Sequence, residues 1–140
     1  MSGEGCNMFK KITEMHEGFR ISHHHIQFTQ AEKDFRTLAM IEEVNEYMNA
    51  KTKAEELDAL VDVVIFALGT AERQGMLEVF KSAYLRVMEA NCKKEVGGNL
   101  KRNNFQIDLV KPEGWEPAFL EDLVEPSKQI EINFGEGEYK

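Results

Sequence analysis

Residues 54–75, AEELDALVDVVIFALGTAERQG, predict one helix in the middle of the chain, and this helix decides the fold. Between Ala59 and Leu68 every side chain is apolar except Asp62. A helix that is apolar on all sides is buried, either in the centre of a bundle or at a subunit interface. Thr52 is placed to cap its N-terminus, with Glu55 at the position of a capping box, and Gly75 is placed to end it. A lone carboxylate in such a helix needs a partner or a metal, because its burial is costly.

Three further helices are predicted around this segment, so the fold class is all-α: a four-helix bundle protomer with an extended C-terminal arm. Residues 99–140 form the arm, because they hold all three prolines and Trp115, with one helical turn expected at 119–124. We expect a helical domain at 1–98 and an arm at 99–140 that packs on the body or on a neighbouring subunit. The three helices cover residues 8–21, 31–50 and 76–96, and each has an apolar stripe at helical spacing. The stripe of the first helix consists of Met8, Ile12, Met15 and Phe19, and that of the second of Phe35, Leu38, Ile41, Val44 and Met48. The stripe of the helix over 76–96 consists of Met76, Phe80, Tyr84 and Val87.

The amino-acid composition argues against some classes of binding partner. The chain has 140 residues with 25 acidic and 17 basic side chains, a net charge of -8, which argues against nucleic-acid or anionic-membrane partners. The two cysteines, Cys6 and Cys92, are interpreted as reduced thiols. Residues 1–11 lack the apolar segment of a signal peptide, and no apolar segment of the sequence is long enough to span a bilayer. We therefore expect a cytoplasmic protein. The histidines at 23–25 are interpreted as a solvated loop.

Carboxylates gather on two neighbouring predicted helices. Glu42, Glu43 and Glu46 share one helix face, and Asp58 and Asp62 share a face of the next helix, because residues three or four apart are neighbours. The connection is short, so the helices should pack antiparallel with the two groups facing each other. Seven acidic residues lie between positions 42 and 62 against two basic ones. Such repulsion is relieved most simply by a bound cation.

Each group has a simpler interpretation by itself, since the glutamates can be solvated and Asp62 can be protonated or hydrogen-bonded. Taken together they predict a metal site. A di-iron centre needs Glu-x-x-His, which the four histidines do not provide, and no spacing suggests zinc or an EF-hand. Carboxylate oxygens suit Mg²⁺, with Mn²⁺ as an alternative, and Mg²⁺ commonly completes its shell with substrate phosphates.

The motifs EEVNE at 42–46 and DALVD at 58–62 resemble the all-α nucleoside triphosphate pyrophosphohydrolases of the MazG type. That superfamily also includes dimeric dUTPases and phosphoribosyl-ATP pyrophosphohydrolases. Its pattern is E-E-x-x-E followed by E-x-x-D on the next helix, and Glu42, Glu43, Glu46 and Asp62 match it. The chain departs at Ala59, where the pattern has Glu, so Asp58 would have to serve, as in a variant found in phage and bacterial members.

The resemblance implies a function and further site residues. EMHEGF near the start, Arg36, EANCKK at 89–94 and KPEGWEP at 111–117 extend it over roughly residues 8–120. It implies a homodimer or homotetramer that cleaves a (d)NTP between the α and β phosphates to the monophosphate and pyrophosphate. In a phage-encoded protein the location would be the host cytoplasm.

The same resemblance, together with the acidic groups, assigns roles to single residues. Glu43, Glu46 and Asp62 would be metal ligands, and Asp58 would be a further ligand. Glu42 and Glu43 would be catalytic, with Glu42 acting as the base or orienting the attacking water. Asn91, Lys94 and Arg36 would contact the substrate. Alternatives are a non-catalytic helical interaction protein that kept the fold, and a hydrolase of modified nucleotides. The preferred base does not follow from the sequence.

Overall fold

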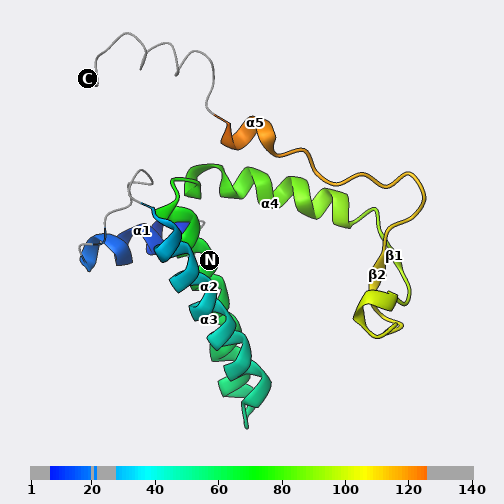
Figure 1. Ribbon diagram of the computed structural model, residues 1–140, viewed down its shortest axis with the longest axis horizontal. Helices are drawn as coiled ribbons and strands as arrows, with labels where there is room; N and C mark the ends of the chain where they lie inside the picture. Colours follow the sequence, from blue (N-terminus) through cyan, green and yellow to red (C-terminus); the bar gives the residue numbers. More distant parts are fainter. Residues whose placement is uncertain (1–6, 20, 22–27, 126–140) are drawn as a thin grey trace. The chain divides into compact units, whose positions relative to one another are not determined.

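The computed structural model describes residues 7–19, 21 and 28–125 (Figure 1). The chain divides into two compact units, Met1–Glu78 and Val79–Lys140, and each is described by itself. Apart from one small pair of strands, the regular structure of the described residues is helical, which confirms the all-α class. The bundle arrangement, the oligomer and the domain boundary at residue 98 stay predictions. The histidines at 23–25 and the end of the arm, from residue 126, lie outside the described residues.

The first unit contains α1 (Met8–Gly18), α2 (Gln30–Asn49) and α3 (Lys53–Arg73). Helices α2 and α3 lie side by side as an antiparallel hairpin, and α1 contacts α3 (Figure 1). Thr52 is the N-cap of α3 as predicted, since its Oγ1 accepts from the backbone N–H of Glu55 at 3.1 Å. The Glu55 carboxylate accepts from the Lys51 N–H at 2.7 Å, one residue before the amide of a capping box. Gly75, at a φ of 73°, follows the end of α3, as expected.

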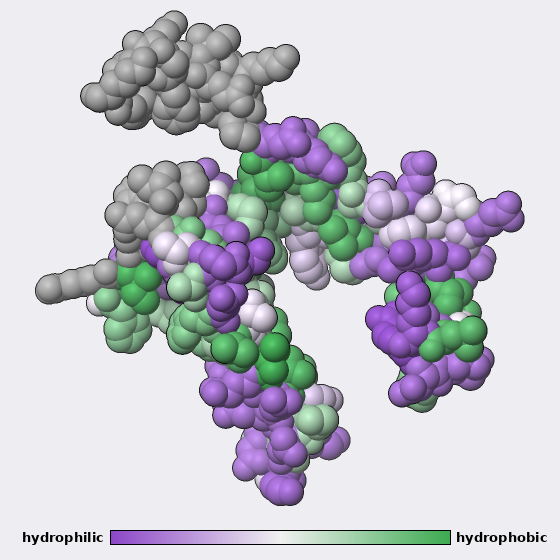
Figure 2. Space-filling model, viewed as in Figure 1, coloured by the Kyte–Doolittle hydropathy of each residue, from purple (hydrophilic) through white to green (hydrophobic). Residues whose placement is uncertain are grey.

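The apolar stripe predicted as the buried face of α2 is exposed, and this corrects the expected core. The five stripe residues retain between 50% and 70% of their exposure: Phe35, Leu38, Ile41, Val44 and Met48. The seam with α3 contains Arg36 and Glu43 on α2, and Ala59, Asp62 and Gly69 on α3. Helix α3 also exposes apolar side chains, such as Leu60 and Val64, although its apolar run predicted burial on all sides. Figure 2 shows apolar green on the visible side of this hairpin and a hydrophilic purple tip.

The second unit holds most of α4 (Leu77–Asn91), followed by β1 (Glu95–Val96), the 3₁₀ turn η3 (Leu100–Arg102), β2 (Leu109–Val110) and α5 (Glu121–Val124). The strands are antiparallel and pair Glu95 with Val110 and Val96 with Leu109. The helix predicted over 76–96 therefore ends five residues early. Non-local pairing with β2 supplies the backbone partners that the helix would have supplied, and local periodicity cannot reveal such pairing.

The arm contacts α4 at two points. Trp115 Nε1 donates to the carbonyl of Ala90 at 2.7 Å, and this satisfies an acceptor in the last turn of α4. Arg86 donates to the carbonyl of Phe119 and forms two bonds, of 2.7 and 3.1 Å, with the carboxylate of Asp122 on α5. The single helical turn expected at 119–124 is present as α5.

No helix among the described residues is long and apolar enough to cross a membrane.

Candidate active site

A cleft of about 630 Å³ opens between α2 and α3 beside the turn that joins them. The four predicted metal ligands, Glu43, Glu46, Asp58 and Asp62, all line it. The arrangement follows from the hairpin, because the short connection places residues at similar distances from the turn opposite each other. The remaining lining residues are Asn49, Ala50, Ala54, Glu55 and Ala59.

Glu43 is the most perturbed group in the cleft. Its carboxyl group lies within hydrogen-bond reach of that of Glu46, and this contact is the main reason that the pKa of Glu43 is raised to about 7. Desolvation adds to the shift, as does repulsion from Glu46, Asp62 and Glu42. Oε2 of Glu43 is buried and finds no hydrogen-bond partner among the described residues. Two carboxylates this close repel each other when both are ionised, which favours the protonated form of Glu43.

Ala59, the departure from the family pattern, is 4% exposed and lines the cleft. Its small side chain lets the two helices approach closely at this point. Asp58, the neighbouring residue, is exposed and lines the same cleft. The role of Asp58 as a metal ligand stays a prediction.

The donor set of the cleft consists of carboxylate oxygens, which fits a hard divalent cation. Within residues 7–19, 21 and 28–125, no three acidic, histidine or cysteine side chains stand close enough, as they are placed, to hold one ion. Glu43 and Glu46 already meet, whereas Asp58 and Asp62 line the cleft without converging on them.

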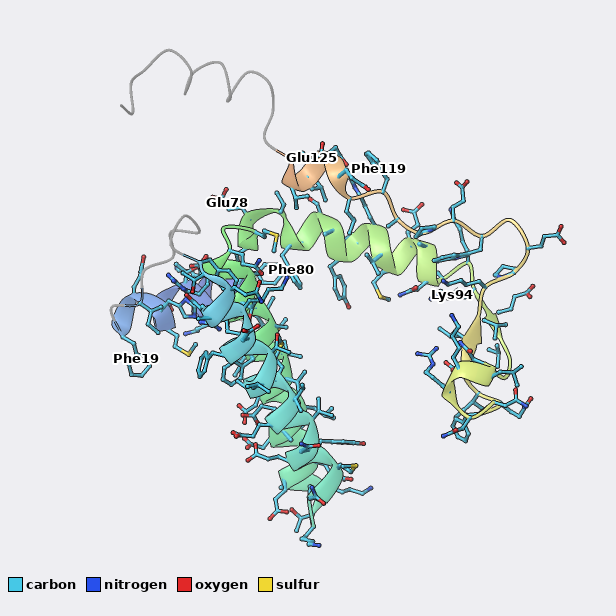
Figure 3. All side chains as sticks on the ribbon, in the orientation of Figure 1. Phe19, Glu78, Phe80, Lys94, Phe119 and Glu125 are labelled. Atoms are coloured by element: carbon cyan, nitrogen blue, oxygen red, sulfur yellow. The ribbon has the colours of Figure 1, made fainter. Side chains whose placement is uncertain are left out.

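The other predicted residues have different surroundings. Glu42 is exposed on α2 next to Glu43. Arg36 is buried, 8% exposed, and its Nε donates to Glu32 at 3.4 Å, so it lies in an ion-pair network instead of on an open surface. Asn91 and Lys94 belong to the second unit, at and just beyond the end of α4 (Figure 3). Their contact with substrate stays a prediction.

The network around Arg36 is a feature that sequence reasoning missed. Glu32 accepts two bonds from Arg73, at 2.5 and 2.6 Å, and joins α2 to α3 near the end opposite the cleft. The bonds from Arg73, followed by those from Arg36, hold the pKa of Glu32 below its usual value, although burial opposes the shift. A Cβ on Gly69 would lie 3.2 Å from Nε2 of His16 and 3.3 Å from Arg36, so this glycine admits both side chains against α3. The sequence signal for this network was Gly69, followed by the charged residues Glu72 and Arg73, in an otherwise apolar helix.

Comparisons of the chain with protein-family models, with curated proteins and with solved structures found no match.

Proposed function

We propose that this protein is a metal-dependent nucleoside triphosphate pyrophosphohydrolase, which converts a (d)NTP to the (d)NMP and pyrophosphate. One observation carries the proposal: the contact between Glu43 and Glu46, with a buried carboxylate oxygen that has no partner among the described residues, in a cleft also lined by Asp58 and Asp62. A clustered carboxylate set of this kind is costly without a positive charge. The motif resemblance connects the same residues to phosphate chemistry.

The residues have the following proposed roles. Glu43, Glu46 and Asp62, with Asp58, would hold Mg²⁺ or Mn²⁺, which supplies charge neutralisation at the phosphates and acidifies a bound water. Glu42, exposed beside Glu43, would orient the attacking water and accept its proton. The water oxygen bonds to the α phosphorus as the bond from that phosphorus to the bridging oxygen breaks, and pyrophosphate leaves. Lys94 would act as a point charge on the phosphates and Asn91 as a hydrogen-bond donor.

We further propose that the protein works as a homodimer or homotetramer. Helix α3 exposes Leu57, Leu60, Val61 and Val64 by 46–64%, in addition to the exposed stripe of α2. Several of these residues line an apolar groove of about 460 Å³ between α1 and α3. Contiguous apolar surfaces of this kind are typical of interaction sites, and a second copy of the hairpin would supply a matching apolar face.

The decisive experiment is a panel of all common (d)NTPs with Mg²⁺ or Mn²⁺ and a readout of released pyrophosphate. We expect hydrolysis of at least one nucleotide. Glu46→Gln and Asp62→Asn, which keep the shape of the side chain, should each lower the rate of hydrolysis by more than roughly 10- to 100-fold. Losses within that range are typical of residues that hydrogen-bond to a metal ligand without binding the metal themselves. Glu56→Gln is the matched control, because Glu56 lies on α3, the helix of Asp62, but outside the cleft.

Full activity of either cleft variant would contradict the proposal. A flat response across the panel, combined with tight binding of a protein partner, would instead favour the non-catalytic interaction protein. Circular dichroism of each variant separates a lost site from a lost fold.

A further inference from the structure

One aromatic ring in the second unit contacts two cations. The ammonium group of Lys94 lies 4.9 Å from the ring centroid of Trp115, and that of Lys111 lies 5.2 Å from the same centroid. Both distances are within the range of cation–π attraction. Figure 3 shows Lys94 where the chain leaves α4 toward β1. The resemblance implies a contact with substrate for Lys94, but it gives neither Lys111 nor Trp115 a role.

One hydrogen bond holds the ring of Trp115, and another holds its backbone. Its indole N–H donates to the carbonyl of Ala90 at 2.7 Å, and its backbone N–H donates to the carbonyl of Pro112 at 3.0 Å. The second bond closes a tight turn in which Gly114 has a φ of 80°, a conformation that suits glycine. Trp115 is therefore a fixed platform, whereas lysine side chains on a surface are normally free to rotate.

The two lysines are also placed together by the strands. The register pairs Glu95 with Val110; Lys94 directly precedes Glu95 and Lys111 directly follows Val110, so the two lysines flank the same end of the strand pair. Both ammonium groups lie near the same ring, and like charges brought this close together repel each other. An arrangement that gathers two cations on one ring, against their mutual repulsion, is stabilised when an anion binds between them.

The local charge is consistent with an anion site. Residues 91–111 hold five basic and two acidic side chains in a chain whose net charge is -8. One of these acidic residues, Asp108, is paired with Arg102, whose guanidinium group donates two hydrogen bonds of 2.8 Å to its carboxylate. Among the described residues, neither Lys94 nor Lys111 has an ion-pair partner. Both ammonium groups are thus available to a ligand.

We propose that Lys94 and Lys111, held by the ring of Trp115, form a two-lysine subsite for the phosphate chain of the nucleotide. The identity of the ligand rests on the proposed function. Lys111 is a further binding residue, and Trp115 is a positioning residue that acts through both lysines. A chain of two or more phosphates matches two point charges better than a single phosphate does.

The first test uses Trp115 as its own probe, because it is the only tryptophan in the chain. The full-length protein is titrated with inorganic pyrophosphate and with tripolyphosphate in EDTA, and intrinsic fluorescence is recorded. We expect a saturable change in emission as the ammonium groups shift from the ring toward the ligand, with weaker binding of orthophosphate. No change in emission, together with no heat of pyrophosphate binding in calorimetry, would overturn the proposal.

Variants separate the subsite from general charge. Lys94→Gln and Lys111→Gln should each weaken pyrophosphate binding by about tenfold, the effect of one charge-assisted hydrogen bond. Lys93→Gln is the matched control, since Lys93 is the adjacent lysine and makes no cation–π contact among the described residues. Equal losses in all three variants would mean diffuse attraction and would refute the subsite.

The role of Trp115 is tested with two substitutions measured by calorimetry. Trp115→Leu removes the ring and should weaken pyrophosphate binding, whereas Trp115→Phe keeps a ring and should restore most of the affinity although it loses the bond to Ala90. If both variants bind equally well, Trp115 does not position the lysines. Because Trp115→Leu also removes a bond to the end of α4, Lys111→Gln serves as the variant that leaves this bond intact.

The two proposals fail in different ways. Pyrophosphate binding that depends on Lys111, without hydrolysis of any nucleotide, would support the subsite and contradict the enzyme. Hydrolysis with a KM for the nucleotide that is the same in Lys111→Gln and in the unsubstituted protein would support the enzyme and contradict the subsite.

Discussion

The carboxylate pair in the cleft predicts that metal binding depends on pH near neutrality. With a pKa of about 7, Glu43 carries a proton through much of the range from pH 5 to pH 7. A metal must displace that proton, because a ligating carboxylate is deprotonated. The affinity of the cleft for Mg²⁺ should therefore fall as the pH falls through 7, well above the usual range for a glutamate.

The size of the effect follows from competition with one proton. At about pH 8 most of Glu43 is ionised, and at about pH 6 roughly nine-tenths of it is protonated when the pKa is about 7. The apparent Mg²⁺ affinity should then be about tenfold weaker at pH 6 than at pH 8. An unperturbed carboxylate, with a pKa of about 4.3, would produce almost no change over this interval.

Isothermal titration of the metal-free protein with Mg²⁺ or Mn²⁺, at a series of pH values and in buffers of different ionisation enthalpy, measures both affinity and proton release. We expect release of close to one proton per bound metal near pH 6 and little near pH 8. Glu43→Gln removes the titrating group and should bind metal weakly at every pH. Glu56→Gln, on α3 outside the cleft, should behave as the unsubstituted protein does.

The same pair has an effect on stability without metal, and its sign is opposite to that of an ordinary salt bridge. A carboxyl group whose pKa is raised in the folded state stabilises fully below its unfolded value of 4.5, and that stabilisation is lost as the pH rises through about 7. The metal-free protein should therefore melt at a lower temperature at pH 8 than at pH 6, and Mg²⁺ should restore the difference. Metal affinity that is equal at pH 6 and pH 8 would refute the reasoning.

Two further predictions concern the first unit. Glu32→Gln removes the negative charge that pairs with Arg73 and Arg36, and it should lower the free energy of unfolding in urea by about 2–3 kcal/mol, below the range for a fully buried pair because the Glu32 side chain is 22% exposed. The control Glu14→Gln, at an exposed ion pair, should leave the free energy of unfolding unchanged, and equal effects would contradict the assigned network. Val64→Glu introduces a charge on the exposed apolar face of α3 and should lower the mass found by light scattering, whereas Lys33→Glu on α2 should not; a monomeric unsubstituted protein would contradict the proposed assembly.

Local sequence signals predicted the helices of the first unit closely. The spacing of apolar residues, Thr52 before α3 and Gly75 after it are all local features, and the observed bounds agree with them. The sequence also predicted that Glu43, Glu46, Asp58 and Asp62 line one cleft, since a short turn and helical spacing determine which residues are opposite.

The tertiary structure alone decided which face of α2 packs on α3. Periodicity shows that Phe35, Leu38 and Ile41 share a face, but it does not say whether that face is covered by the same chain or left exposed. In this hairpin the seam is filled by small residues and by paired charges such as Glu32 and Arg73, whose contact spans 41 positions of sequence. No local pattern indicates an ion pair between residues so far apart.

The sequence by itself therefore determined the helical class, the helix starts and the identity of the acidic residues, because these depend on neighbours within a few positions. The tertiary structure decided the early end of α4 at Asn91, the pairing of β1 with β2, and the contact of Trp115 with both Lys94 and Lys111. The strand pairing joins residues 13 and 15 positions apart, and the contact of Lys94 with Trp115 spans 21 positions. Their energies arise only when the chain brings such segments together.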